Sequence, residues 1–174
     1  AYQGIREDLF KIAYGSYMIE VVDKLAPERE RHPELFTLLT DFLGILEARG
    51  VSEDLLRVFE VRLLDDLGLR PHVSDCVICH TPLISGTRVR FSSEKGGAIC
   101  NRCVKGVPIT NPVSIGTLKT LEMAIKIDPL KIPRLVFSRE VRDESREILR
   151  GFIRFHTGRE LKSLEFIEKI KGVK

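Results

Sequence analysis

A chain of 174 residues, 43% of them hydrophobic, can bury the core of one domain and add a small module. No apolar run approaches the ~20 residues of a membrane span, and no basic segment leads into an apolar stretch, which predicts neither a membrane span nor a signal peptide. The net charge of +3 is divided into −6 over residues 1–75, +4 over 76–130 and +5 over 131–174. A polyanion would therefore meet the C-terminal part, unless these charges only solvate helix faces.

Three helices are predicted in the first 75 residues. Apolar positions at helical spacing indicate a first helix from Ile5 towards Leu25, ended by Ala26 and Pro27. Pro33 suits the first turn of a second helix, which ends near Gly50. The apolar positions that define these two helices are Ile5, Leu9, Ile12 and Ile19 in the first, and Leu35, Leu38, Leu39, Phe42, Leu43 and Leu46 in the second.

The third helix begins at a clear cap. Ser52 is a favourable N-cap, and Glu53 and Asp54 follow in the first turn, where the helix dipole favours negative charge. The helix should stop at Gly68. Its expected inward residues are Leu55, Leu56, Phe59, Leu63, Leu64 and Leu67.

Residues 72–112 break the helical pattern with four glycines and short β-like pieces such as 87–91, which predicts a loop-and-strand module. Helical periodicity resumes at Ser114 and lasts until Pro129. A last long helix is expected over about 140–156, with Gly158 as its stop, followed by an amphipathic segment over 161–170. The expected buried face of the long helix consists of Ile148, Leu149, Phe152, Ile153 and Phe155.

Two cysteine pairs carry the most specific pattern. Cys76 and Cys79 form one Cys-x-x-Cys pair, and Cys100 and Cys103 form another after twenty intervening residues. Each pair can turn both sulfurs towards one point, so two pairs can complete a tetrahedron around zinc with Zn–S bonds of ~2.3 Å. Two disulfides are the main alternative, and they need an oxidising compartment. A thioredoxin-like redox motif needs only one pair, and His80 could replace a sulfur or lie at the surface.

Four thiolates would fill the coordination shell and leave no position for an activated water. The predicted zinc is therefore structural, and no catalytic residues are expected. A zinc hydrolase remains as a remote alternative, which cobalt substitution would test.

A basic ridge is predicted on the last long helix. Arg142, Arg146, Arg150 and Arg154 recur every four residues, so each is rotated by ~40° from the one before it. Arg159 and Lys162 follow after the glycine. Arginine suits phosphate oxygens, which makes these six residues candidates for DNA binding. Interleaved acidic residues, Asp143, Glu144 and Glu147, could instead pair with the arginines and leave an ordinary solvated face.

Several segments in this order resemble the C-terminal part of the RecO family of bacterial recombination and repair mediators. The matching segments are IREDL (5–9), YMIEVVD (17–23), PELF (33–36), LRVFEVRLLDDLG (56–68), the two cysteine pairs with GAIC (97–100), and HTGRELKS (156–163). The resemblance covers essentially all 174 residues. Many members of that family carry glycine where this chain has His80, which leaves the tightness of that turn open.

The resemblance implies a mainly α fold: a helical bundle-like domain, 1–75 and 104–174, interrupted by a zinc-ribbon-like module, 76–103. It also implies an N-terminal OB-fold that these residues do not include. The implied protein is a cytoplasmic, nucleoid-associated one without enzymatic activity. It binds single- and double-stranded DNA and anneals strands, and it helps to load the recombinase. The implied partners are RecR and the C-terminal tail of single-stranded DNA-binding protein, with Arg57 matching a position that grips this tail. The alternative is a zinc-containing interaction adaptor that does not bind DNA itself.

Overall fold

The computed structural model describes residues 2–27, 31–86 and 89–172, and these form a mainly helical protein with a small sheet, as predicted. The helices are α1 (Gln3–Arg6), α2 (Leu9–Leu25), α3 (Pro33–Arg49), α4 (Glu53–Asp66), α5 (Ile115–Lys126), α6 (Arg139–Thr157) and α7 (Lys162–Gly172). The strands are β1 (Val89–Ser92), β2 (Gly97–Cys100) and β3 (Asn111–Val113), and two 3-10 turns, Val104–Gly106 and Pro129–Arg134, complete the list. Within the described ranges, no helix has the length and apolar character that crossing a membrane requires.

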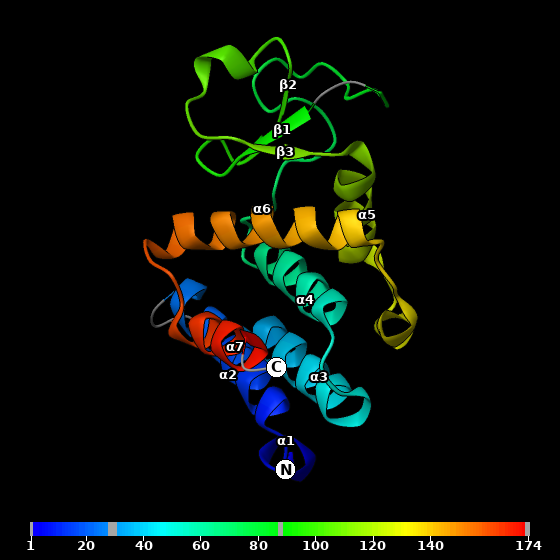
Figure 1. Cartoon of the computed structure of the whole chain (residues 1–174), viewed down its shortest axis with the longest axis vertical. Coiled ribbons are helices and arrows are strands. Elements are labelled where there is room, and N and C mark those ends of the chain that lie inside the picture. Colours follow the sequence, from blue (N-terminus) through cyan, green and yellow to red (C-terminus); the bar gives the residue numbers. More distant parts are fainter. Residues whose placement is uncertain (1, 28–30, 87–88, 173–174) are drawn as a thin grey trace.

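The elements form two tiers on either side of α6. The three strands and their loops lie at one end of the molecule, and α6 crosses directly beneath them (Figure 1). On the other side of α6, α4 leads down to α1, α2, α3 and α7 (Figure 1). Helix α6 therefore contacts both the sheet and the helical part.

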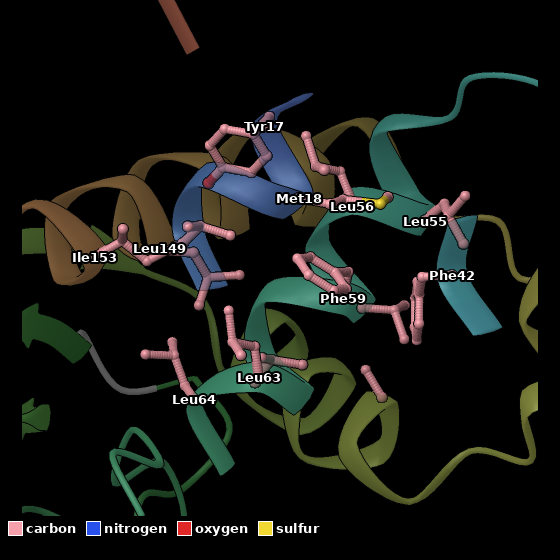
Figure 2. Packing of buried hydrophobic residues seen from close by; sticks show 14 of the residues in the cluster. Tyr17, Met18, Phe42, Leu55, Leu56, Phe59, Leu63, Leu64, Leu149 and Ile153 are labelled. Carbon is pink, nitrogen blue, oxygen red and sulfur yellow. The ribbon is translucent and has the colours of Figure 1, made fainter. Parts of the chain in front are cut away.

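Helix α4 forms the centre of the core because most of its residues are buried. Its Phe59 is fully buried and packs against Phe42 of α3, with ring centroids 5.3 Å apart. Tyr17 and Met18 from α2 and Leu149 from α6 join the same cluster (Figure 2). Each such side chain contributes about 1.5–3 kcal/mol when buried. The apolar stripes predicted for 33–49 and 52–67 therefore do form the core.

Local caps explain why the helices begin where the sequence predicts. The hydroxyls of Ser52 and Ser114 accept hydrogen bonds from the backbone N–H groups of Leu55 and Thr117. Pro33 occupies the first turn of α3. These positions were all predicted.

The single helix predicted from Ile5 towards Leu25 is wrong, because residues 3–25 form two helices, α1 and α2. The Asp8 carboxylate caps α2 by accepting from the backbone N–H groups of Phe10 and Lys11, at 2.8 and 3.0 Å. The apolar positions that indicated this helix are also largely exposed, with Leu9 at 54%, Ile12 at 38% and Ile19 at 52%. The buried face consists instead of Ala13, Tyr14, Tyr17, Met18 and Val21. Both sides of α2 are apolar, so spacing alone could not identify the inner one.

The sheet has the order β2-β1-β3 and is antiparallel throughout. Strand β3 lies beyond the range 76–103 predicted for the module, whose boundaries remain a prediction. Of the predicted β-like piece 87–91, Thr87 and Arg88 lie outside the described residues. Phe91 of β1 packs edge-on against Phe152 of α6, with centroids 5.8 Å apart.

The sheet module packs closely on α6 at Gly151. A Cβ there would lie 3.4 Å from the Ser93 hydroxyl oxygen, so the β1–β2 turn leaves room for little more than a methyl group at this position. Phe155, predicted for the buried face, is 52% exposed instead. The face of α6 that is covered by the sheet and by α4 ends at Phe152 and Ile153.

Candidate metal centre and basic surface

Two tight turns bring the four cysteines together. The backbone N–H of His80 donates to Cys76 O at 2.8 Å, and that of Cys103 donates to Cys100 O at 3.1 Å. A hydrogen bond from Val77 N to Ala98 O joins the first turn to β2. The four sulfur atoms consequently lie within 4.8 Å of one another. This cluster can hold a metal ion.

The spacing fits a tetrahedral thiolate site. Sulfurs at ~2.3 Å from a shared metal would be separated by about 3.8 Å, and Cys79 Sγ lies 3.7 Å from Cys100 Sγ. This separation is far above the ~2.05 Å of a disulfide, and all four cysteines are free. The Cys100 backbone N–H also points at Cys76 Sγ, at 3.4 Å, as donors do around metal-bound thiolates.

The electrostatics of the cluster also favour a cation. Hydrogen bonding with Thr81 lowers the pKa of Cys79 to about 6. Hydrogen bonding with Cys79 raises the pKa of Cys103 to about 12, because a thiolate beside another thiolate is unfavourable. Four thiolates this close need a positive charge among them, which a divalent ion supplies.

His80 lies outside the sulfur cluster. Its side chain is 73% exposed, and Nδ1 is 3.4 Å from Asp75 Oδ1. Its backbone has φ 55°, a left-handed conformation that glycine adopts freely. The turn therefore keeps the geometry of a glycine turn although it carries an imidazole.

The six predicted DNA-binding residues fall into two groups. Each of the four predicted arginines on α6 faces a carboxylate, whereas Arg159 and Lys162 follow the end of α6 and are exposed. Arg142 is the most firmly held, with Nε 2.7 Å from Asp54 Oδ1 and a second guanidinium nitrogen 2.9 Å from Oδ2. These bonds raise the pKa of Arg142.

Arg146 and Arg154 have looser partners, whereas Arg150 pairs with two carboxylates. Arg146 lies 3.0 Å from Asp143 and 3.6 Å from Glu53, and Arg150 lies 2.9 Å from Glu160 and 2.5 Å from Glu168. Arg154 is the most exposed of the four, with 62% of its side chain accessible and Glu160 at 3.6 Å. Of the acids interleaved on α6, Asp143 pairs with Arg146, whereas Glu144 accepts hydrogen bonds from Ser114 and Thr117. Glu53 and Asp54 come from the distant helix α4, so the sequence did not reveal them, whereas Glu160 and Glu168 lie in the segment that follows α6.

Arg57 is buried, with only 4% of its surface exposed. One guanidinium nitrogen lies 2.9 Å from Glu60 Oε1, which also accepts a hydrogen bond from the Tyr17 hydroxyl. Burial raises the pKa of Glu60. Among the described residues, Arg57 Nε and Glu60 Oε2 have no hydrogen-bond partner. Such orphan atoms are rare in protein cores.

A cavity of about 150 Å³ lies beside this pair. It brings Arg57 together with Arg146 and Arg150, which the sequence had assigned to a different role. Leu164, Ile167 and Lys171 reach it from α7, and only the amphipathic pattern of that helix could have indicated that they line a cavity. The other lining residues are Leu56, Glu53, Glu60 and Glu168. The cavity therefore combines cationic and apolar groups.

The fold and the site define the class of this protein: a mainly helical protein that carries a small sheet with a candidate four-cysteine metal centre. A model of the family described as "Recombination protein O C terminal" matches residues 6–165. The chain belongs to this RecO family and corresponds to its C-terminal part.

Relatives in several bacteria agree with this assignment. The chain is 38% identical to the DNA repair protein RecO of Syntrophus aciditrophicus (strain SB) over 169 residues, 96% of this chain and 65% of the relative. It is 36% identical to that of Anaeromyxobacter dehalogenans (strain 2CP-C) over 95% of this chain and 65% of the relative. It is 38% identical to that of Pelotomaculum thermopropionicum over 95% and 63%. The chain thus spans just under two thirds of the length of these relatives.

Proposed function

We propose that this chain is the C-terminal part of a non-catalytic mediator of DNA repair and recombination. In this proposal the whole protein binds single- and double-stranded DNA and anneals complementary strands. It also helps to load the recombinase on DNA coated with single-stranded DNA-binding protein, together with RecR, in the bacterial cytoplasm and at the nucleoid. Family membership over residues 6–165 carries the proposal. Annealing makes no covalent bond, so it requires cationic surface to offset repulsion between polyanions and no nucleophile.

The proposed cofactor is a structural Zn²⁺ held by Cys76, Cys79, Cys100 and Cys103. The 3.7 Å separation of Cys79 Sγ and Cys100 Sγ and the crowding of four ionisable thiols support it. Zinc would fix the two turns and the β1–β2 hairpin. Cobalt exchanged into the cluster tests this proposal, because a closed tetrathiolate site gives intense thiolate-to-cobalt bands.

The proposed DNA-binding residues differ in how readily they can leave their carboxylate partners for a phosphate. An exposed ion pair contributes only ~0–1 kcal/mol, so Arg154 can exchange Glu160 for a phosphate at little cost. Arg159 and Lys162 are also exposed. Arg146 and Arg150 would contribute after leaving their carboxylates. Arg142 would contribute least, because its bidentate pair with the buried Asp54 holds it.

Salt dependence tests this surface. Changing Arg154, Arg159 and Lys162 together to glutamine should lower the log–log salt slope for a single strand by about 2, at ~0.7 for each lost phosphate contact. The matched control is Arg139→Gln, on the same helix and 95% exposed in its side chain, which should leave the slope unchanged. Gel shifts across salt, on this chain beside the full-length protein, would measure both. An unchanged slope in the triple variant would remove these residues from the DNA surface.

A second candidate is an interaction adaptor, and the cavity beside Arg57 favours it. Cationic residues beside apolar Leu56, Leu164 and Ile167 suit a peptide that ends in acidic and apolar residues, such as the tail of single-stranded DNA-binding protein. Arg57→Ala should abolish tail binding, but it also leaves Glu60 buried and unpaired, which costs about 3–5 kcal/mol of stability. Lys171 at the cavity is the cleaner probe because it is partly exposed.

Fluorescence anisotropy with a labelled tail peptide separates the two candidates. Lys171→Gln should weaken peptide binding by about tenfold and leave DNA binding intact. Lys169→Gln, on the same helix and outside the cavity, is the matched control. If both variants bind the peptide as the native chain does, the cavity is not the peptide site.

A further inference from the structure

A second group of potential metal ligands lies beside the cysteine cluster. His72, Asp75 and His80 place one ligand atom each within 4.8 Å of the other two. His72 Nε2 is 2.7 Å from Asp75 Oδ1, and His80 Nδ1 is 3.4 Å from the same oxygen. The two imidazole rings are nearly perpendicular, with centroids 6.2 Å apart. Two imidazole nitrogens thus converge on one carboxylate oxygen.

The backbone holds these three residues in place. His72 pairs with β2 through hydrogen bonds from its N–H to Gly96 O and from Ala98 N to its own carbonyl, at 2.9 and 2.8 Å. This approach requires Gly97, because a Cβ there would lie 2.4 Å from the His72 carbonyl oxygen. Asp75 is bridged to Pro82, and the His80 N–H is bonded to Cys76 O. The turns that present the cysteines therefore also position the three donors.

The backbone of His80 gives a separate reason to expect a role for its side chain. A non-glycine residue at φ 55° is strained, and glycine would avoid this strain. The imidazole at this position lies against Asp75, although it is 73% exposed and buries little surface. Apolar packing therefore does not account for it.

We propose that His72, Asp75 and His80 form a second, exchangeable site for a borderline divalent metal ion such as Zn²⁺, Co²⁺ or Ni²⁺. Two imidazole nitrogens and a carboxylate oxygen suit these ions. Metal–ligand bonds of ~2.0–2.2 Å place adjacent ligand atoms about 3.4 Å apart in a tetrahedral site and about 3.0 Å apart in an octahedral one. The observed 3.4 Å has the tetrahedral spacing, and the 2.7 Å pair would lengthen to admit an ion. Three protein ligands leave coordination positions open to water. The site is thus the opposite of the closed cysteine cluster.

Cobalt titration distinguishes the two sites in one spectrum. The full chain is first loaded with one equivalent of Zn²⁺, confirmed by elemental analysis, and then titrated with Co²⁺. Binding of one further equivalent should give weak visible bands without the intense near-ultraviolet bands of thiolate ligation. Zinc content is measured on the same sample, so failure of the proposed zinc cluster is distinguishable from failure of this second site.

Two variants and one control decide the assignment. His80→Gly keeps the left-handed turn and relieves its strain, and Asp75→Asn keeps the shape of the carboxyl group; each should weaken the second cobalt by about tenfold or more. The control is His32→Ala, which removes another histidine paired with a carboxylate, at 3.1 Å from Glu34, and should bind cobalt as the native chain does. The proposal is overturned if the zinc-loaded chain binds no further cobalt, if cobalt enters only with thiolate bands, or if His80→Gly binds it unchanged.

Discussion

The sheet module and the helical part of this chain reach stability by different means. The module's own apolar cluster centres on Cys76, Ile99 and Val107, whereas the main core draws on every helix, with α4 in its middle, and also receives side chains from the sheet. A cluster as small as that of the module cannot offset the conformational entropy of ordering its loops. Contact of the sheet with the main core and the proposed metal ligation must therefore supply the rest of the module's stability.

In the helical part, polar contacts between helices add to the apolar packing. Carboxylates from one helix bind the N-terminus of another element: Glu20 binds the first turn of α7, and Glu144 binds that of α5. Asp54 accepts the Phe137 backbone N–H at 3.0 Å. Each carboxylate meets N–H groups that a helix or loop leaves free. These bonds fix how the helices sit on one another.

The largest expected effect is on the module alone. Removing the proposed zinc with a strong chelator in reducing buffer should abolish up to about 10–16 kcal/mol of apparent binding energy and unfold the module. Hydrogen exchange should then show rapid exchange of β1 and β2 amides while α4 amides stay protected. Adding zinc back should restore the protection. Loss of protection in α4 at the same time would mean that the two parts fold as one unit.

A substitution in the core of the helical part should destabilise the helices and leave the metal content unchanged. Phe59→Ala removes a fully buried ring that packs on Phe42, and it should cost about 3–5 kcal/mol of unfolding free energy. Denaturant unfolding followed by circular dichroism measures the loss. The zinc content of the folded variant should stay unchanged. A variant that loses its zinc before its helices unfold would contradict the separation of the two parts.

Sequence patterns predicted those features whose causes are local. Ser52 and Ser114 begin helices because their hydroxyls bond to N–H groups three residues on, and the Cys-x-x-Cys turns need only neighbouring backbone. Contacts between distant segments were not predictable: Glu20 and Ser163 are 143 residues apart, and Asp54 and Arg142 are 88. The serine of HTGRELKS had no role until the structure placed it on Glu20. Phe155 and Ile19 were misleading because helical spacing does not identify which neighbour covers a face.

The ion pair between Asp54 and Arg142 should contribute more to stability than the exposed ion pairs on α6. Asp54→Asn should cost about 1–3 kcal/mol, because the buried group loses charge-assisted bonds to Arg142. Asp143→Asn is the control, since it breaks only exposed pairs and should cost less than ~0.5 kcal/mol. Thermal unfolding of both variants makes the comparison. Equal costs would show that Arg142 is no more tightly held than Arg146.

The smallest effect concerns the bond between α2 and α7, and it depends on pH. Partial burial opposes ionisation of Glu20, but hydrogen bonds from Ser163 and Lys162 outweigh it and hold its pKa below 4.5. A lowered pKa stabilises the fold above pH 4.5, and this stabilisation is lost as the pH falls through the folded-state pKa. Glu20→Gln should therefore be less stable than the native chain at pH 7, and the difference should shrink in acid. Denaturant midpoints across pH 3–7 test this. A difference that does not change with pH would assign the loss to packing.

The junction between Gly151 and Phe152 limits how freely the module could be transplanted. A recipient scaffold would need a helix with a small residue beneath the Ser93 turn and, at the next position, an aromatic ring for Phe91. A scaffold from which the module was excised would in turn display Phe152 to water. The module is thus fitted to a single helix, and a change in either surface requires a matching change in the other.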